Sequence, residues 1–210
     1  MSRVPNPKPA NTSAWGYALV PLIIFAAIVA LFVFALGSGD PSNLPSALLN
    51  KPPPQTKFAP LENVKRDGRA LPGFDVSEVL AENKNSLNGK AQKTIVINFW
   101  ASWCGPCILE HPQIVALAQR PDVDVYGVNY KDQPNDARQY LRRYGNPYKA
   151  LGTDPNGRGA IEWGVTKMPE TFVISPAGKV VFKFSGPITK DVLATAIRPA
   201  IERASGKKGP

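Results

Sequence analysis

The stretch INFWASWCGPCILEHP (Ile97–Pro112) contains Cys104 and Cys107, the only two cysteines in a chain of 210 residues. Gly105 and Pro106 separate them. A pair at this spacing is compatible with three chemistries: a structural disulfide, half of a metal site, or two thiols that are oxidised and reduced in turn. The rest of the sequence discriminates between these three.

A metal site and a structural disulfide both fit this pair poorly. A structural zinc site needs four ligands, whereas the pair supplies two and the only histidine of the chain is His111. No metal is therefore predicted. A disulfide across so short a loop adds little stability, because the stabilisation grows with the number of residues enclosed. A redox-active pair is the remaining interpretation.

The position of the pair also favours reactivity. Thr94–Trp100 is a short apolar run that predicts a strand buried on both faces, and Cys107–Ala118 has the polarity pattern of a helix. Cys104 therefore lies at the mouth of a helix, where unpaired N–H groups and the helix dipole lower the pKa of a thiol. We predict that Cys104 is the nucleophile and that Cys107 resolves the mixed disulfide. Their disulfide is then the redox centre, and no other cofactor is expected.

The remaining elements alternate between strand and helix. Strands are predicted at Val123–Tyr130 and, as a hairpin, at Thr171–Ser175 and Lys179–Phe184; helices are predicted at Asn135–Tyr144 and Lys190–Ala204. A parallel unit joined to an antiparallel hairpin predicts an α/β domain with a mixed central sheet flanked by helices.

The N-terminal part of the chain has the pattern of a membrane anchor. Residues 15–36 contain no charge, and as a helix they would be about 33 Å long, enough to cross a bilayer. A cleaved signal peptide is the alternative, with Arg3 and Lys8 as its basic region and a cleavage site near Gly37. We favour the uncleaved anchor because the apolar run exceeds the roughly 7–15 residues of a signal peptide.

The charges that flank the apolar run predict its orientation. Basic residues precede it and Asp40 follows it, which places the N-terminus in the cytoplasm and the remainder outside. We therefore expect a single-pass protein of a bacterial inner membrane with its C-terminal domain in the periplasm. The predicted parts are a cytoplasmic tail (1–14), a transmembrane anchor (15–36), a proline-rich linker (37–57), a globular domain (58–204) and a flexible tail (205–210).

The net charge of +9 does not indicate a nucleic-acid partner. Residues 61–204 contain 19 basic and 15 acidic residues, mixed in sign and scattered, and the excess lies toward the two ends of the chain. A nucleic-acid interface would concentrate basic residues along one element with interleaved aromatics. No nucleic acid is therefore expected among the partners.

The residues around the cysteines resemble the active site of the thioredoxin superfamily. Phe99–Cys107 (FWASWCGPC) matches its strand and active-site turn, and Pro112 matches the proline within its active-site helix. Met168–Pro169 matches the cis-proline loop that faces the cysteines in that family. The resemblance implies a thioredoxin-like fold. It also implies that the cis-proline loop, Met168–Pro169, offers backbone hydrogen bonds to an extended substrate. Trp103, next to the nucleophile, is expected to shape a partner-docking surface, and Gly105 and Pro106 are expected to contact substrate as well.

Further motifs are similar to the membrane-anchored DsbE/CcmG (CycY-like) branch. They are Ala70–Phe74, Glu110–His111, Gly127–Asp132, Gly145–Tyr148 and Gly164–Phe172, and the similarity covers about residues 58–204. The branch implies a reductant that keeps the cysteines of apocytochrome c, or of a maturation thiol protein, reduced for haem attachment. A transmembrane thiol reductase would supply the electrons. The alternatives are a general or copper-site periplasmic thiol reductase, or a redox-regulated binding module without catalysis.

Some positions depart from thioredoxin itself. Asn98 occupies the place of a buried aspartate that helps to deprotonate the resolving cysteine there, and an amide cannot accept that proton. Glu110 and Glu170 match acidic positions of the DsbE/CcmG branch and are the candidates for proton exchange; the alternative for each is a solvated surface acid. His111 is expected on the helix surface.

Overall fold

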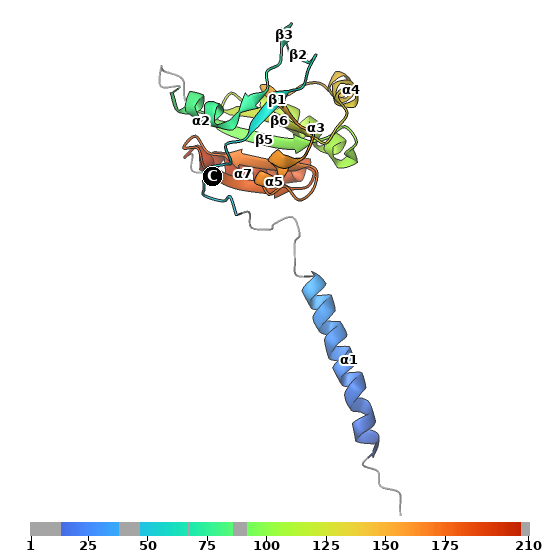
Figure 1. Ribbon diagram of the computed structural model, residues 1–210. Helices are drawn as coiled ribbons and strands as arrows, with labels where there is room; N and C mark the ends of the chain where they lie inside the picture. Colours follow the sequence, from blue (N-terminus) through green and yellow to red (C-terminus); the bar gives the residue numbers. More distant parts are fainter. Residues whose placement is uncertain (1–13, 38–46, 67, 86–91, 207–210) are drawn as a thin grey trace, which may run out of the picture. The chain divides into compact units, whose positions relative to one another are not determined.

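The structure is a computed structural model that describes residues 14–37, 47–66, 68–85 and 92–206 (Figure 1). The chain divides into two compact units, residues 1–41 and 42–210. In the first unit α1 runs from Ala14 to Gly37 and contains Pro21. Within the described residues, no helix has both the length and the apolar character needed to span a membrane. The side chains of 14–18 and 35–37 lie outside the description, and the span over 15–36 stays a prediction.

The second unit is built on a seven-stranded sheet in the order β4-β1-β7-β6-β5-β8-β9. Its strands are β1 (Lys57–Pro60), β4 (Phe74–Asp75), β5 (Thr94–Trp100), β6 (Val123–Tyr130), β7 (Ala150–Asp154), β8 (Glu170–Ile174) and β9 (Val180–Ser185). β5, β6 and β7 are parallel, whereas the other neighbours pair antiparallel. A separate pair consists of β2 (Lys65–Arg66) and β3 (Arg69–Ala70). The sheet is mixed, as predicted.

Helices cover both faces of this sheet. They are α2 (Val76–Asn85), α3 (Gly105–Ala118), α4 (Pro134–Tyr144), α5 (Arg158–Glu162), α6 (Lys190–Val192), a π-helical segment (Leu193–Ile197) and α7 (Arg198–Ala204). Side chains of β5 alternate between two cores. Val96 and Trp100 pack with α3, α4, α7 and both cysteines, whereas Ile95, Ile97 and Phe99 pack with α2 and α5. Every residue of β5 is buried, which explains the uninterrupted apolar run.

The predicted elements are recovered with small shifts, and several elements were missed. β5 and β6 have the predicted bounds, and α4 and the β8–β9 hairpin differ by one residue at their ends. The final helix is interrupted by the π-helical segment. β7, whose five residues ALGTD carry no alternation, was not predicted from the sequence, and neither were α2 and the short strands β1 to β4.

Part of the expected linker packs on the domain. The N–H of Asn50 donates to the carbonyl of Val180 at 2.8 Å, and the N–H of Val180 donates to Lys51 at 2.9 Å. Pro53 is buried. The backbone of Asn50 and Lys51 therefore pairs with the edge of the sheet at β9. Residues 38–46, most of the first half of the expected linker, lie outside the description.

Candidate active site

The cysteine pair lies where β5 passes into α3. Cys104 is the N-cap residue of α3, with extended backbone angles (φ −86°, ψ 101°), and its sulfur accepts a hydrogen bond from the N–H of Cys107 at 3.2 Å. The two residues form a disulfide with a Cα–Cα distance of 5.3 Å. Pro106 occupies the first turn of the helix, where its missing N–H leaves no bond unmade. The N-terminus of α3 is thus aimed at the sulfur predicted to be the nucleophile.

The two cysteines are both buried, but their surroundings are accessible. Cys104 is 3% exposed and Cys107 is 1% exposed. Gly105, Pro106 and Trp103 are exposed beside them. Among the described residues of the domain, the large apolar side chains that face solvent are Trp103, Leu109 and Ile161, and Trp103 is 58% exposed. The disulfide therefore lies beside three exposed residues, while both cysteines are shielded from water.

Asp132 fixes the loop that precedes Cys104. Its carboxylate accepts hydrogen bonds from the N–H and the hydroxyl of Ser102, both at 2.6 Å, and from the Asn129 amide at 2.8 Å. The indole N–H of Trp103 donates to the carbonyl of Lys131 at 3.0 Å. The loop after β6 therefore holds the active-site turn in place. This role of Asp132 was not predicted from the sequence, although Asp132 lies within the motif Gly127–Asp132 of the resemblance.

Replacing Asp132 with alanine is expected to lower the free energy of unfolding by about 2 kcal/mol, because charge-assisted hydrogen bonds to Ser102 are lost. Urea denaturation of the oxidised protein measures this change. The control is Asp136→Asn, on the first turn of α4, which should change stability by less than about 1 kcal/mol. Equal effects of the two substitutions would contradict a specific role for Asp132.

The Met168–Pro169 peptide bond is cis, as the resemblance implies. Pro169 is buried, and Met168 packs against the same core as both cysteines. The carbonyl of Pro169 accepts a hydrogen bond from the N–H of Gly186 at 2.9 Å. The role of this loop in holding substrate stays a prediction.

Glu110 is buried one turn beyond Cys107, so the alternative of a solvated surface acid is wrong for it. It is 1% exposed. Its Oε1 accepts from the Asn98 amide at 2.8 Å and its Oε2 accepts from the N–H of Ile188 at 3.0 Å. Burial raises the pKa of Glu110 to about 7, and these two hydrogen bonds act in the opposite direction. A carboxyl with this pKa exchanges protons near neutral pH.

Asn98 links Glu110 to a buried tyrosine. The Asn98 amide nitrogen also donates to the Thr171 hydroxyl at 3.1 Å, and its oxygen accepts from the Tyr148 hydroxyl at 2.8 Å. Tyr148 fits only because residue 127 is glycine, since a Cβ there would lie 2.8 Å from the tyrosine ring. Burial raises the pKa of Tyr148 well above its ordinary value, so this hydroxyl stays protonated and donates. Tyr148 was not predicted as a site residue, although it ends the Gly145–Tyr148 motif.

Glu170 is also buried, so for it too a solvated surface acid is wrong, but it lies away from the cysteines. Asn98 pairs with Thr171 across β5 and β8, and Glu170 pairs with Phe99 on the opposite face of the sheet. Its Oε1 accepts from the Ser185 hydroxyl at 2.7 Å. Its Oε2 lies 3.0 Å from Lys183 Nζ, within ion-pair distance but not aligned as a hydrogen bond. These contacts tie Glu170 to β9.

The expectation that His111 lies on the helix surface is wrong. His111 is 3% exposed. Its Nε2 lies 3.1 Å from the carbonyl of Gly145 and therefore donates, and its Nδ1 lies 3.1 Å from the Tyr140 hydroxyl. That hydroxyl also lies 3.0 Å from the carbonyl of Cys107. Burial lowers the pKa of His111. The error has a simple cause: α3 packs against both the sheet and α4, so its buried face is wider than one helical stripe.

Comparison with known proteins identifies the family. The sequence profile of the Redoxin family matches residues 66–197, more than half of the chain. The chain belongs to the Redoxin family. Together with the disulfide at the N-terminus of α3, this membership makes the chain a thiol:disulfide oxidoreductase with a thioredoxin-like fold. Within the described part of the chain, no cluster of three or more His, Cys, Asp or Glu side chains is placed to hold a metal ion.

Individual members of this group are similar to the chain over most of its length. The chain is 37% identical to the thiol:disulfide interchange protein HelX of Rhodobacter capsulatus, over 87% of this chain and 93% of that protein. It is 34% identical to the thiol:disulfide interchange protein DsbE of Escherichia coli K12, over 89% and 94%. A crystal structure of a DsbE-type protein from Chlorobium tepidum superposes with a TM-score of 0.54 and 25% identity, over 74% of this chain and 98% of that one.

Proposed function

We propose that this protein is a membrane-anchored periplasmic reductant of cytochrome c maturation. Its clients would be the disulfide of apocytochrome c or that of a maturation thiol protein. The observation that carries the proposal is the Cys104–Cys107 disulfide at the N-terminus of α3, with Glu110 buried one turn beyond it. Support for the pathway comes from the relatives named HelX and DsbE and from the similarity of the motifs to the DsbE/CcmG branch.

The reduced site would transfer two electrons to the client. The Cys104 thiolate attacks one sulfur of the client disulfide, which forms a mixed disulfide and releases the other client sulfur as a thiolate. Cys107 then loses its proton, and its thiolate attacks the Cys104 sulfur. This step releases the second client thiolate and forms the Cys104–Cys107 disulfide. A transmembrane thiol reductase would return two electrons to the pair.

Glu110 is the better candidate for the proton acceptor of Cys107. The two residues are three apart on α3 and share its buried face, and the pKa of Glu110, raised by burial, lies near 7. Asn98 cannot take the proton, but it orients the carboxylate by donating to Oε1. Glu170 lies on the other face of the sheet, bonded to Ser185 and paired with Lys183, and we do not assign it this role.

Anchoring is proposed on the sequence of residues 15–36. This segment contains no charged residue, and α1 extends over it. An anchor would hold the domain at the outer face of the membrane, close to a transmembrane electron donor.

Deleting the gene is expected to abolish holo-cytochromes of the c type, measured by haem staining of membrane and periplasmic fractions. Re-expression of the wild-type chain should restore them, and an equally expressed Cys104→Ser variant should not. Normal c-type cytochromes together with loss of a copper oxidase would show that the client is a copper site, while the thiol chemistry stands. Full restoration by Cys104→Ser would indicate a binding role instead.

A further inference from the structure

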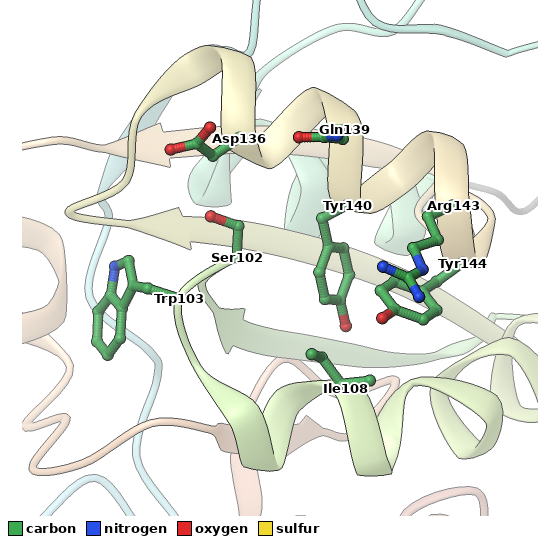
Figure 2. Close-up of a pocket in the computed structure, with 8 residues that line it drawn as sticks. All are labelled: Ser102, Trp103, Ile108, Asp136, Gln139, Tyr140, Arg143 and Tyr144. Carbon is green, nitrogen blue, oxygen red and sulfur yellow. The ribbon is translucent and has the colours of Figure 1, made fainter.

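A groove of about 400 Å³ lies between α3 and α4, directly beside the cysteine turn. In Figure 2 it extends from Trp103 at one end to Arg143 and Tyr144 at the other. Trp103 is the residue before Cys104, and Ile108 is the residue after Cys107. A protein segment whose cysteine reaches the active site can therefore continue into this groove.

The floor of the groove is apolar and fixed. Ile108 of α3 and the ring of Tyr140 from α4 face one another across it (Figure 2). The Tyr140 hydroxyl is held between the carbonyl of Cys107 and His111, so the ring does not swing freely. Such a floor can receive an apolar side chain of an extended peptide.

The rim of the groove has opposite charges at its two ends. Asp136 and Arg143 both line it from α4 and both are exposed. The Arg143 guanidinium is 5.4 Å from the centroid of the Tyr144 ring. In the described part of the chain, neither side chain forms a salt bridge. Both charges are thus open to a ligand, with Asp136 nearer the Trp103 end (Figure 2).

The spacing of the two charges defines a pattern in the ligand. Asp136 and Arg143 are two helical turns apart, which is about 10.5 Å along the axis of α4. An extended segment of the polyproline II type rises about 3.1 Å per residue and has three residues per turn, so side chains three residues apart lie on the same side, about 9 Å from each other. Opposite charges three residues apart in a segment of this type therefore match this rim.

We infer that the groove from Trp103 to Arg143 binds an extended segment of the client protein. The segment places a basic side chain against Asp136, nearer to the reacting cysteine, and an acidic one against Arg143 about three residues farther away. This inference rests on the proposed thiol exchange with a protein client. It adds the pattern of charged residues that the client carries near its reacting cysteine.

Synthetic peptides test the order of the charges. Each peptide carries one cysteine as a mixed disulfide with thionitrobenzoate, and a Lys/Glu pair three residues apart that begins one to three residues from the cysteine, on either side. In one series Lys is nearer to the cysteine, and in the other series Glu is nearer. The reduced full-length chain attacks the peptide sulfur and releases thionitrobenzoate; Cys107 then releases the peptide thiol and closes the Cys104–Cys107 disulfide. The release rate at low and high salt is the measurement.

On at least one side of the cysteine, peptides with Lys nearer are expected to react about two- to tenfold faster, and 0.5 M NaCl should remove the preference. The double substitution Asp136→Lys with Arg143→Glu should reverse the order of preference, whereas Arg142→Glu, next to the groove, should not. Rates are divided by that of an uncharged peptide, which separates a general loss of activity from a change in recognition.

Equal rates for both orders on both sides, or the same preference in the double variant, would overturn the inference. The charges would then serve only the dipole of α4, whose first turn favours acids and whose last turn favours bases. Because the peptides are synthetic, neither outcome depends on whether the natural client is an apocytochrome. Failure of the cytochrome assay would leave this test intact, and failure of this test would leave the proposed pathway intact.

Discussion

Replacing Cys104 with serine is expected to lower the rate of disulfide reduction by about 10³-fold or more, because the hydroxyl cannot form the sulfur–sulfur bond of the intermediate. Replacing Cys107 with alanine is expected to stop the reaction one step later. The mixed disulfide between Cys104 and the client then accumulates, since no second thiol is left to release it. Non-reducing electrophoresis of cells that express Cys107→Ala, followed by mass spectrometry of the adducts, measures the trapping and names the client.

The control is the double variant with both substitutions, which should form no adduct although it differs from the trap by one atom. Retention of turnover by Cys104→Ser would contradict the assignment of the nucleophile. Adducts of equal abundance in the double variant would show that they do not form through Cys104. The geometry favours this assignment, because the N-cap sulfur of Cys104 already accepts the N–H of Cys107, whereas Cys107 lies within the first turn and is the more buried of the two.

The elements that carry the cysteines could be predicted because local sequence dominates there. β5 is buried on both faces, and a short run of mostly apolar residues without alternation is what predicts such a strand. The helix that follows starts at a glycine and a proline, residues that local rules place in a first turn. β7 has no such signal. Its position depends on pairing with β6 and β1, which lie far from it in the sequence.

The polar partners of the site could not be derived in the same way. Asn98 and Tyr148 are 50 residues apart and meet only because Gly127, opposite Asn98 on β6, leaves room for the ring. Asp132 binds Ser102 across a gap of 30 residues. For Glu170, the sequence indicated an acid near the cis-proline but not its face of the sheet, which follows from the register of β8.

Replacing Glu110 with glutamine is expected to remove a large pH dependence of stability. In the unfolded chain the carboxyl has its ordinary pKa of 4.5, whereas burial raises the pKa of Glu110 to about 7 in the folded protein. Between these values the folded state retains a proton that the unfolded chain has released. Folding therefore takes up a proton, and stability falls as pH rises. As pH rises from about 4.5 to about 7, Glu110 lowers the free energy of unfolding of the wild type by about 3 kcal/mol. The variant lacks this contribution, because glutamine does not titrate.

Urea denaturation of the oxidised wild type and of oxidised Glu110→Gln between pH 4 and 8 measures both free energies of unfolding. The gap between them should change by about 3 kcal/mol over this range. His111 and the other acids are common to both proteins, and the cysteines are disulfide-bonded, so their titrations cancel. A pH-independent difference would show that Glu110 does not titrate in this range.

The same substitution tests proton exchange with Cys107. In a Cys104→Ser background only Cys107 can be alkylated. A plot of its alkylation rate against pH should show two steps, because the titrations of Cys107 and Glu110 are coupled, and a single step when Glu110→Gln is added. Glu170→Gln is the matched control: it removes a second buried acid, but from the opposite face of the sheet, and should retain both steps. Thermal unfolding checks that each variant is folded. If the two glutamine variants give the same profile as the parent, the carboxylate of Glu110 does not take the proton, and its burial serves the contact with Asn98 and Ile188 alone.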